Sequence, residues 1–156
     1  MFERTVTDAS PLIIFQRIGQ IDLLEALLRN AFIPPAVRRE VYSANVPPAW
    51  IQEQSLTQPL ASQIIAGRLG AGEREAIALA LEIQATCLVL DDLPARRIAQ
   101  LLHLTVIGSM GLLLQAKHKG LIGAVKPLIE EMQKTGFRVS EHVVTTILMA
   151  ANEATL

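Results

Sequence analysis

The sequence predicts a three-layer α/β/α domain built on a central parallel sheet. Short β-branched or apolar segments alternate along the chain with longer segments whose apolar residues have helical spacing, the order found when helices join parallel strands. In addition, the segment 86–91 is apolar without alternation, which is typical of a strand buried on both faces. The 156 residues suit a single domain, 1–156, with one substantial core.

The first half of the chain predicts two strands and three helices. The strands are short β-branched or apolar runs, and the helices show helical spacing or prolines in the first turn. In chain order we expect a strand over 4–8, helices over about 11–17 and 20–29, a strand over 31–33 and a helix over about 35–43. The proline-containing residues 44–59 predict a loop with room for one short helix, in which Trp50 plugs the core or an interface.

The second half predicts two further strands and five helices. Glycines precede the first of these helices, and Ser140 is placed to cap the last. In chain order we expect a helix over 73–84, a strand over 86–91, a helix over about 93–102, a strand over 104–107, helices over 109–119 and about 124–135, and a final helix after residue 140. Both final helices carry an aliphatic stripe, so they either wrap an edge of the sheet or mediate association.

Composition excludes several classes of protein. Hydrophobic residues make up 51 % of the chain and charged residues 19 %, which excludes a disordered chain. Cys87 is the only cysteine, which excludes an internal disulfide and a zinc finger, and it is expected to be a buried small hydrophobe. No uncharged apolar run reaches the roughly 18 residues of a membrane span, and Glu3, Arg4 and Asp8 interrupt any N-terminal apolar core. We expect a cytoplasmic protein that does not enter a membrane.

Acidic residues follow two of the expected strands. Asp8 ends the first strand, and Asp91 and Asp92 end the strand at 86–91. Sites in open parallel sheets form beyond the carboxyl ends of the strands. If these two strands are neighbours, the acids project into one crevice.

A third acid can be placed by length. The helix over 73–84 is about 18 Å long at 1.5 Å per residue, and the strand over 86–91 is about 20 Å long at 3.3 Å per residue. Because they run in opposite directions across a short turn, Glu73 is expected at the same edge as Asp91. Glu75 lies about 200° further round the helix and cannot share that orientation. Geometry leaves the orientation of Glu40 open.

Each acid also has a purely structural alternative. Asp8 and Asp92 could cap helices, Glu73 could complement a helix dipole, and Glu40 could face solvent. Taken together, however, acids that converge on one edge of an apolar domain need a counter-charge, which Mg²⁺ or Mn²⁺ supplies. Such ions serve phosphodiester cleavage.

Four segments carry a resemblance to a known family. They are Asp8-Ala9-Ser10-Pro11-Leu12-Ile13, Gly72-Glu73-Arg74-Glu75-Ala76-Ile77, Leu90-Asp91-Asp92 with Ala95-Arg96, and Gly108-Ser109-Met110-Gly111. In this order and spacing they resemble the PIN-domain family, and most closely its compact prokaryotic branch of VapC-type toxins. The resemblance covers nearly the whole chain.

The resemblance implies a metal-dependent nuclease site. It assigns Asp8, Glu40, Glu73 and Asp91 to the catalytic acids that bind Mg²⁺ or Mn²⁺, with Asp92 as a near alternative to Asp91. It also assigns the hydroxyl groups of Ser10 and Ser109 to supporting positions near the site. Two departures stand out: the third acid is Glu where many members have Asp, and Val89 replaces the usual hydroxyl residue two positions before Asp91, so that either Ser109 supplies the hydroxyl or activity is weakened.

The predicted function is therefore that of an endoribonuclease, the toxin of a toxin–antitoxin pair, acting as a homodimer with a small antitoxin as partner. The alternative is a catalytically weak PIN-like binding or regulatory module. A receiver-like domain is disfavoured because no Lys ends the strand at 104–107, and none of the three histidines is expected to be catalytic. The net charge of −1 gives no global field for nucleic acid, so RNA binding must use local basic residues. We expect these to be Arg38, Arg39, Lys117 and Lys119.

Overall fold

The fold is organised around a five-stranded, all-parallel sheet. The structure is a computed structural model, and it describes residues 3–58 and 69–154. Within these residues the sheet order is β3-β2-β1-β4-β5. The strands are β1 (Thr5–Thr7), β2 (Ala31–Ile33), β3 (Ile51–Glu53), β4 (Cys87–Val89) and β5 (Val106–Ile107). The predicted fold class is confirmed.

Helices connect and cover the strands. Each helix predicted within the described residues is present, with ends that differ from the prediction by one or two residues in most cases. The helices are α1 (Ala9–Arg17), α2 (Ile21–Leu28), α3 (Pro35–Tyr42), α5 (Ala71–Glu82), α6 (Leu93–Leu101), α7 (Ser109–His118), α8 (Lys126–Lys134) and α9 (Glu141–Ala150).

The region predicted as a loop, 44–59, contains an edge strand instead. Here the prediction was wrong: β3 pairs with β2, with Ala31 opposite Ile51. Ile51 is buried, while Gln52 and Glu53 are exposed. With only these three residues, the strand is too short to show a periodic pattern in the sequence. Trp50, just before it, is 8 % exposed and belongs to the core, as expected. Residue 59, the end of the predicted loop, lies outside the described residues.

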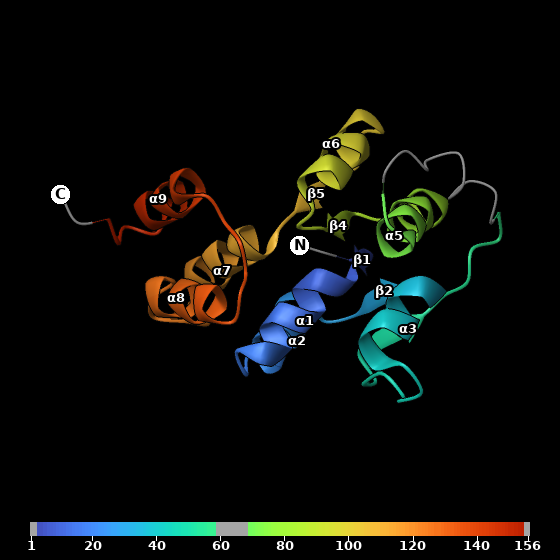
Figure 1. Cartoon of the computed structure of the whole chain (residues 1–156), viewed down its shortest axis with the longest axis horizontal. Coiled ribbons are helices and arrows are strands. Elements are labelled where there is room, and N and C mark those ends of the chain that lie inside the picture. The colour runs from blue at the N-terminus through green and yellow to red at the C-terminus, as the bar shows by residue number, and fades with distance from the viewer. Residues whose placement is uncertain (1–2, 59–68, 155–156) are drawn as a thin grey trace.

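Alternate residues of each strand face two separate cores, which makes the sheet the middle of three layers (Figure 1). Val6 and Leu88 face α5 and α6, whereas Ile33 and Val89 face the core formed by α1, α2 and α7. Because both faces are covered, every side chain of β1 and β4 is buried, including Cys87. The helix α3 packs against both α1 and α5.

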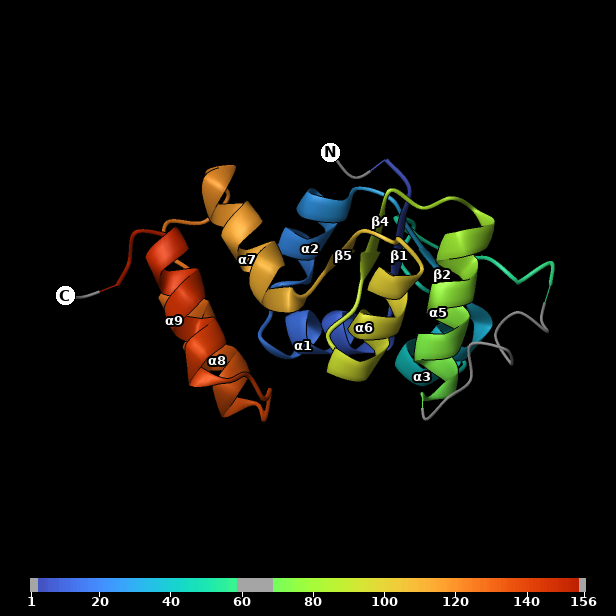
Figure 2. The same cartoon turned by 90° about the horizontal axis from the view of Figure 1, so that it is seen from above.

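The last three helices gather at one end of the molecule, away from α3 and α5 (Figures 1 and 2). Of the predicted stripe on α9, Val144, Ile147 and Leu148 are partly buried against the core, while Val143 stays 39 % exposed. Most of that stripe is therefore used within the chain. Among the described residues, no helix has both the length and the apolar character needed to cross a membrane.

The end of α9 is held by Glu153. Its Oε2 accepts hydrogen bonds at 2.8 Å from Lys117 Nζ and at 2.8 Å from the Val125 backbone N–H, and its Oε1 accepts one at 3.1 Å from Lys126 N–H. One carboxylate thus ties the chain after α9 to α7 and to the start of α8. Partial burial of Glu153 acts to raise its pKa, but these hydrogen bonds outweigh it and the pKa is lowered.

We predict that Glu153→Gln lowers the free energy of unfolding by about 1–2 kcal/mol at neutral pH, because Lys117 loses its charged partner. A lowered carboxyl pKa stabilises the fold above the unfolded-state pKa, and this contribution is lost as pH falls through the folded-state pKa. Urea unfolding should therefore show a difference at about pH 7 that disappears near pH 3. Glu25→Gln, an exposed change on α2, is the control. Equal effects of the two changes would contradict the prediction.

Candidate active site

The two strands that end in acids are neighbours, as predicted. β1 pairs with β4, with Thr7 opposite Val89, and the Asp8 backbone N–H donates to Val89 O at 3.0 Å. From β1 the chain builds the sheet first towards β2 and β3 and later towards β4 and β5, so the strand order reverses between β1 and β4. Ligands of such sheets bind beyond the carboxyl ends at this reversal. Asp8 follows β1 directly, and Asp91 follows β4 after one residue.

Asp8 is the buried centre of this edge. The residue is 1 % exposed, and its Oδ1 is buried with no hydrogen-bond partner among the described residues. Asp8 stands at the N-cap position of α1, yet its side chain makes no capping hydrogen bond. The pKa of Asp8 is raised to about 7, chiefly by burial; the Ala9 backbone acts to lower it, and the negative charges of Glu73, Glu40 and Asp91 contribute to the rise. The structural alternative of a simple helix cap therefore does not account for Asp8.

Asp91 and Asp92 have different surroundings. The Asp92 carboxylate caps α6 by accepting a hydrogen bond from the Ala95 N–H at 3.0 Å. For Asp92, the structure therefore shows the helix-capping role that the sequence offered as an alternative to metal binding. Asp91 instead accepts from the Ser109 N–H at 2.7 Å and from Ser109 Oγ at 2.6 Å. Burial raises the pKa of Asp91, while both Ser109 hydrogen bonds and the charge of Arg96 act to lower it. Of the pair, Asp91 is the one held in the site by a dedicated partner.

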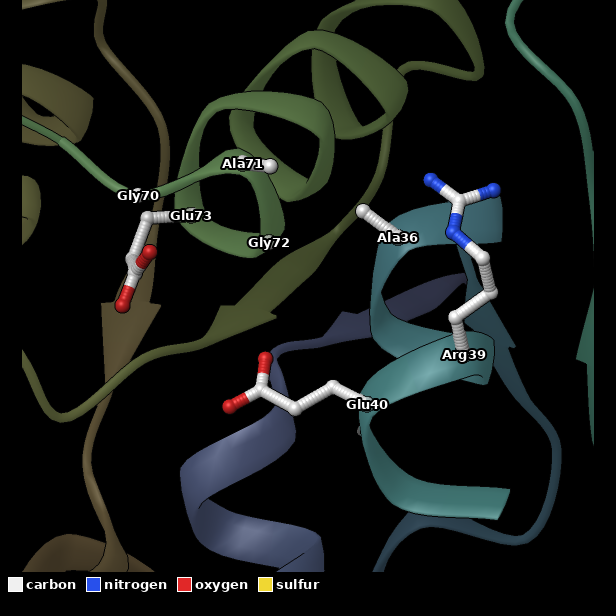
Figure 3. A pocket seen from close by; sticks show the side chains of 7 residues that line it. All are labelled: Ala36, Arg39, Glu40, Gly70, Ala71, Gly72 and Glu73. Atoms are coloured by element: carbon white, nitrogen blue, oxygen red, sulfur yellow. The ribbon is translucent and has the colours of Figure 1, made fainter. Parts of the chain in front are cut away.

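Glu40 turns towards Asp8, which answers the question that geometry alone left open. A Cβ added to Gly72 would lie 3.2 Å from Asp8 Oδ1 and 3.3 Å from Glu40 Oε2, so the two carboxylates flank the same point on α5. In Figure 3, Glu40 from α3 and Glu73 from the start of α5 extend towards the same space, while Arg39 points in another direction. A side chain at position 72 would crowd both carboxylates, so glycine suits this close approach.

Glu73 and Glu75 face different neighbours. Glu73 lines a hollow together with Asp91 and Ser10, and its charge acts on Asp8. Glu75 accepts from the Ala36 N–H at 3.4 Å and lies 3.9 Å from Arg39. The placement of Glu73 at the edge with Asp91, and of Glu75 away from it, agrees with the argument from helix rotation.

The basic residues expected to contact RNA are mostly engaged elsewhere. Arg38 lies 3.5 Å from Glu53, and Arg39 lines a hollow beside Glu40 but pairs with Glu75. Lys117 is used by the fold, since its Nζ donates to Ala151 O at 2.6 Å and to Glu153. Lys119 is exposed just beyond the end of α7. The prediction that Lys117 helps to form the RNA path gains no support from this position.

Three hollows run in series along the carboxyl edge of the sheet. The first, about 550 Å³, lies between α3 and α5 and includes Glu40 and Glu73. The second, about 400 Å³, shares Glu73 with the first and adds Asp91. The third, about 550 Å³, shares Asp91 with the second and extends between α6 and α9. Glu40, Glu73 and Asp91 therefore line one groove made of these hollows, whereas Asp8 is buried and lines none of the three.

Arginines that were not predicted as site residues line this groove, although Arg96 belongs to a segment that carries the family resemblance. Arg17 and Arg138 line the second hollow, and Arg138 also lines the third together with Arg96. Arg17 is the last residue of α1, a helix whose first turn follows Asp8. Arg138 had no signal in the sequence, because nothing in its local pattern relates the segment after α8 to the strand ends.

The donor set suits a divalent cation of the Mg²⁺ or Mn²⁺ kind. Within residues 3–58 and 69–154, no three acidic, histidine or cysteine side chains are close enough to bind one ion together. Mg²⁺ in proteins is commonly held by one or two carboxylates and several waters, so close contact of three is not required. The unpartnered Oδ1 of Asp8, with three further carboxylates acting on it, fits such an ion.

Comparison with known families supports the interpretation of these carboxylates as a site for a divalent metal ion. A family model described as a PIN domain matches residues 4–153, which is nearly the whole chain. Comparisons with curated proteins and with solved structures give no match. PIN-domain proteins are generally nucleases that use divalent metal ions. The chain belongs to the PIN-domain family.

Proposed function

We propose that this protein is a Mg²⁺- or Mn²⁺-dependent endoribonuclease whose catalytic acids are Asp8, Glu40, Glu73 and Asp91. One observation carries the proposal: the buried Asp8 Oδ1 has no hydrogen-bond partner in the described part of the chain, although three other carboxylates act on the same side chain. Without a cation such an arrangement is costly, because like charges in a poorly solvated site repel strongly. The choice of RNA as the substrate rests on the resemblance to VapC-type toxins.

Each acid has a distinct task in this proposal. Asp8 and Asp91, on adjacent strands, would hold the ion, and Glu40 and Glu73 would hold and orient the water molecules around it. Bound there, Mg²⁺ or Mn²⁺ supplies positive charge for the scissile phosphate, activates water and stabilises the leaving oxygen. Asp92 is assigned to capping α6 and has at most an outer role.

The hydrogen bonds from Ser109 to Asp91 favour a catalytically active site over one with weakened activity. Val89 replaces the expected hydroxyl residue, but Ser109 supplies both a hydroxyl and a backbone N–H to Asp91. Two hydrogen bonds fix the carboxylate and favour its ionised form. Ser10, exposed on the first turn of α1, lines the hollow that contains Glu73 and Asp91 and is placed to bind water there.

The biological role that we propose is that of a toxin controlled by a small antitoxin, with the toxin itself a homodimer. Large apolar side chains outside the core, such as Leu101 at 79 % and Met149 at 62 % exposure, support association. Sedimentation should give a dimer at micromolar concentration. A monomer without a co-purifying partner would rule out the dimer.

We predict that Asp8→Asn, Asp91→Asn and Glu73→Gln each lower the rate of Mg²⁺-dependent cleavage of single-stranded RNA by at least about 100-fold, because each removes a charge from the metal site. Glu75→Gln is the matched control: it lies on the same helix but contacts α3, and it should keep most of the activity. Cleavage rates and circular dichroism would be measured for all four. Retained activity in Asp8→Asn, or loss in Glu75→Gln alone, would refute the assignment.

We also predict a pH-dependent gain in stability from Asp8→Asn in metal-free buffer. The pKa of Asp8 is about 7 in the folded protein, above its unfolded value, so its protonated form is favoured by folding and stability is lost as pH rises towards 7. The substitution should raise Tm by several degrees at pH 8 and much less at pH 5. Mn²⁺ should stabilise the original protein more than the variant. An equal change in Tm at both pH values would contradict this prediction.

A further inference from the structure

We propose that the third hollow is a nucleotide subsite, which takes an unpaired base of the RNA next to the cleaved phosphodiester. This inference rests on the proposed nuclease function and adds a position that selects the substrate. It concerns the space between α6, β5 and α9, which contains none of the proposed catalytic acids except Asp91 at its boundary.

The third hollow adjoins the acid cluster, so the nucleotide next to the cleaved phosphodiester would lie in this hollow. The second and third hollows share Asp91, Phe137 and Arg138. An RNA strand with one phosphate at Asp8 and Asp91 therefore has the third hollow directly beside its next residue. The first hollow, on the other side of Glu73, offers a path for the strand in the opposite direction.

The charges on this side complement a phosphate. Arg138 forms no ion pair with any residue that the structure describes, in contrast to Arg38 and Arg39, which pair with Glu53 and Glu75. Arg96 reaches across Gly108, so that a Cβ on that glycine would meet its Nη1, and it donates weakly to Leu90 O at 3.5 Å. These two guanidinium groups flank the third hollow, where they can bind the phosphate that follows the cleaved one.

The walls of the hollow suit a base. Val106, Ile107, Val143 and Ile147 give it an apolar lining, and Gln100 offers an amide donor and acceptor for a base edge. Its volume of about 550 Å³ lies within the range of small-ligand sites. A base can enter only if it is unstacked and unpaired, which favours single-stranded RNA over a duplex.

The segment that carries Arg138 is fixed by the end of α8. Gly136 adopts φ +96°, a left-handed conformation that favours glycine, and the Phe137 N–H donates to Met132 O at 3.1 Å. Arg138 thus follows a defined turn that directs the chain along both hollows. This favours a subsite formed before RNA arrives.

The test compares two bulky substitutions on α9, Val143→Trp and Thr145→Trp, which replace side chains of nearly equal shape. Val143 lines the third hollow and Thr145 does not, although it is exposed on the same helix. Both would be made in an Asp8→Asn background, which blocks cleavage and lowers repulsion of phosphate. Binding of a fluorescent ten-nucleotide unstructured RNA, and of the same oligomer lacking all its bases, would be measured by anisotropy in EDTA.

We expect Val143→Trp to weaken binding of the complete RNA at least about tenfold and to leave binding of the abasic oligomer nearly unchanged. Thr145→Trp should affect neither. Arg138→Ala should weaken both oligomers and make the salt dependence shallower, whereas Arg97→Ala, exposed on α6, should change the salt dependence little.

The outcomes separate this inference from the proposed function. If the original protein cleaves RNA but Val143→Trp and Thr145→Trp bind both oligomers alike, the subsite is refuted while the nuclease stands. If no cleavage is found but base-dependent binding is lost in Val143→Trp alone, the subsite stands without the nuclease. If Val143→Trp instead changes the sedimentation of the protein without affecting RNA binding, the hollow is an interface between proteins and the inference is overturned.

Discussion

The rest of the site depends on the pairing of β1 with β4. This pairing places Asp8 at the point where the strand order reverses, with Asp91 one strand away. The Oδ1 of Asp8 is buried and has no hydrogen-bond partner within residues 3–58 and 69–154. Burying a carboxylate without a partner works against folding. The protein limits this cost by letting Asp8 take up a proton more readily, as the raised pKa shows. A bound cation would replace that proton, so the same burial that destabilises the metal-free edge favours metal binding.

Two glycines make this close arrangement of charged groups possible. Gly72 lets the first turn of α5 approach Asp8 and Glu40, and Gly108 leaves space beside Asp91 and Arg96 at the start of α7. A side chain at position 108 would force Arg96 and Asp91 to move, and one at position 72 would make tight contacts with Asp8 and Glu40. The helix starts therefore contribute in two ways: they bring Glu73 and Ser109 to the edge, and their glycines leave room for the carboxylates on the strands.

The sequence predicted the parts of this site that depend on element order and length. Asp8, Glu73 and Asp91 were placed correctly at one edge, because strand ends and a helix antiparallel to its strand are fixed by residue counts. The orientation of Glu40 could not be predicted, since it depends on how α3 packs between α1 and α5. The short edge strand β3 was missed because three residues carry no measurable period, and the pairing of Lys117 with Glu153 could not be predicted because Glu153 lies far along the chain.

With a net charge of −1 and an acidic centre, the proposed ribonuclease would have to attract RNA by the distribution of its charge. On the α3 side of the acids, Arg38 and Arg39 are paired with carboxylates, which reduces their value for binding phosphate. On the other side, Arg17, Arg96 and Arg138 line the groove next to Asp91 and form no ion pairs within the described part of the chain. The attraction is therefore one-sided. In the proposed nuclease this asymmetry would orient a bound strand, because the phosphate among the acids would be held from the side of these guanidinium groups, and the base that follows it would be directed to the apolar hollow between α6 and α9.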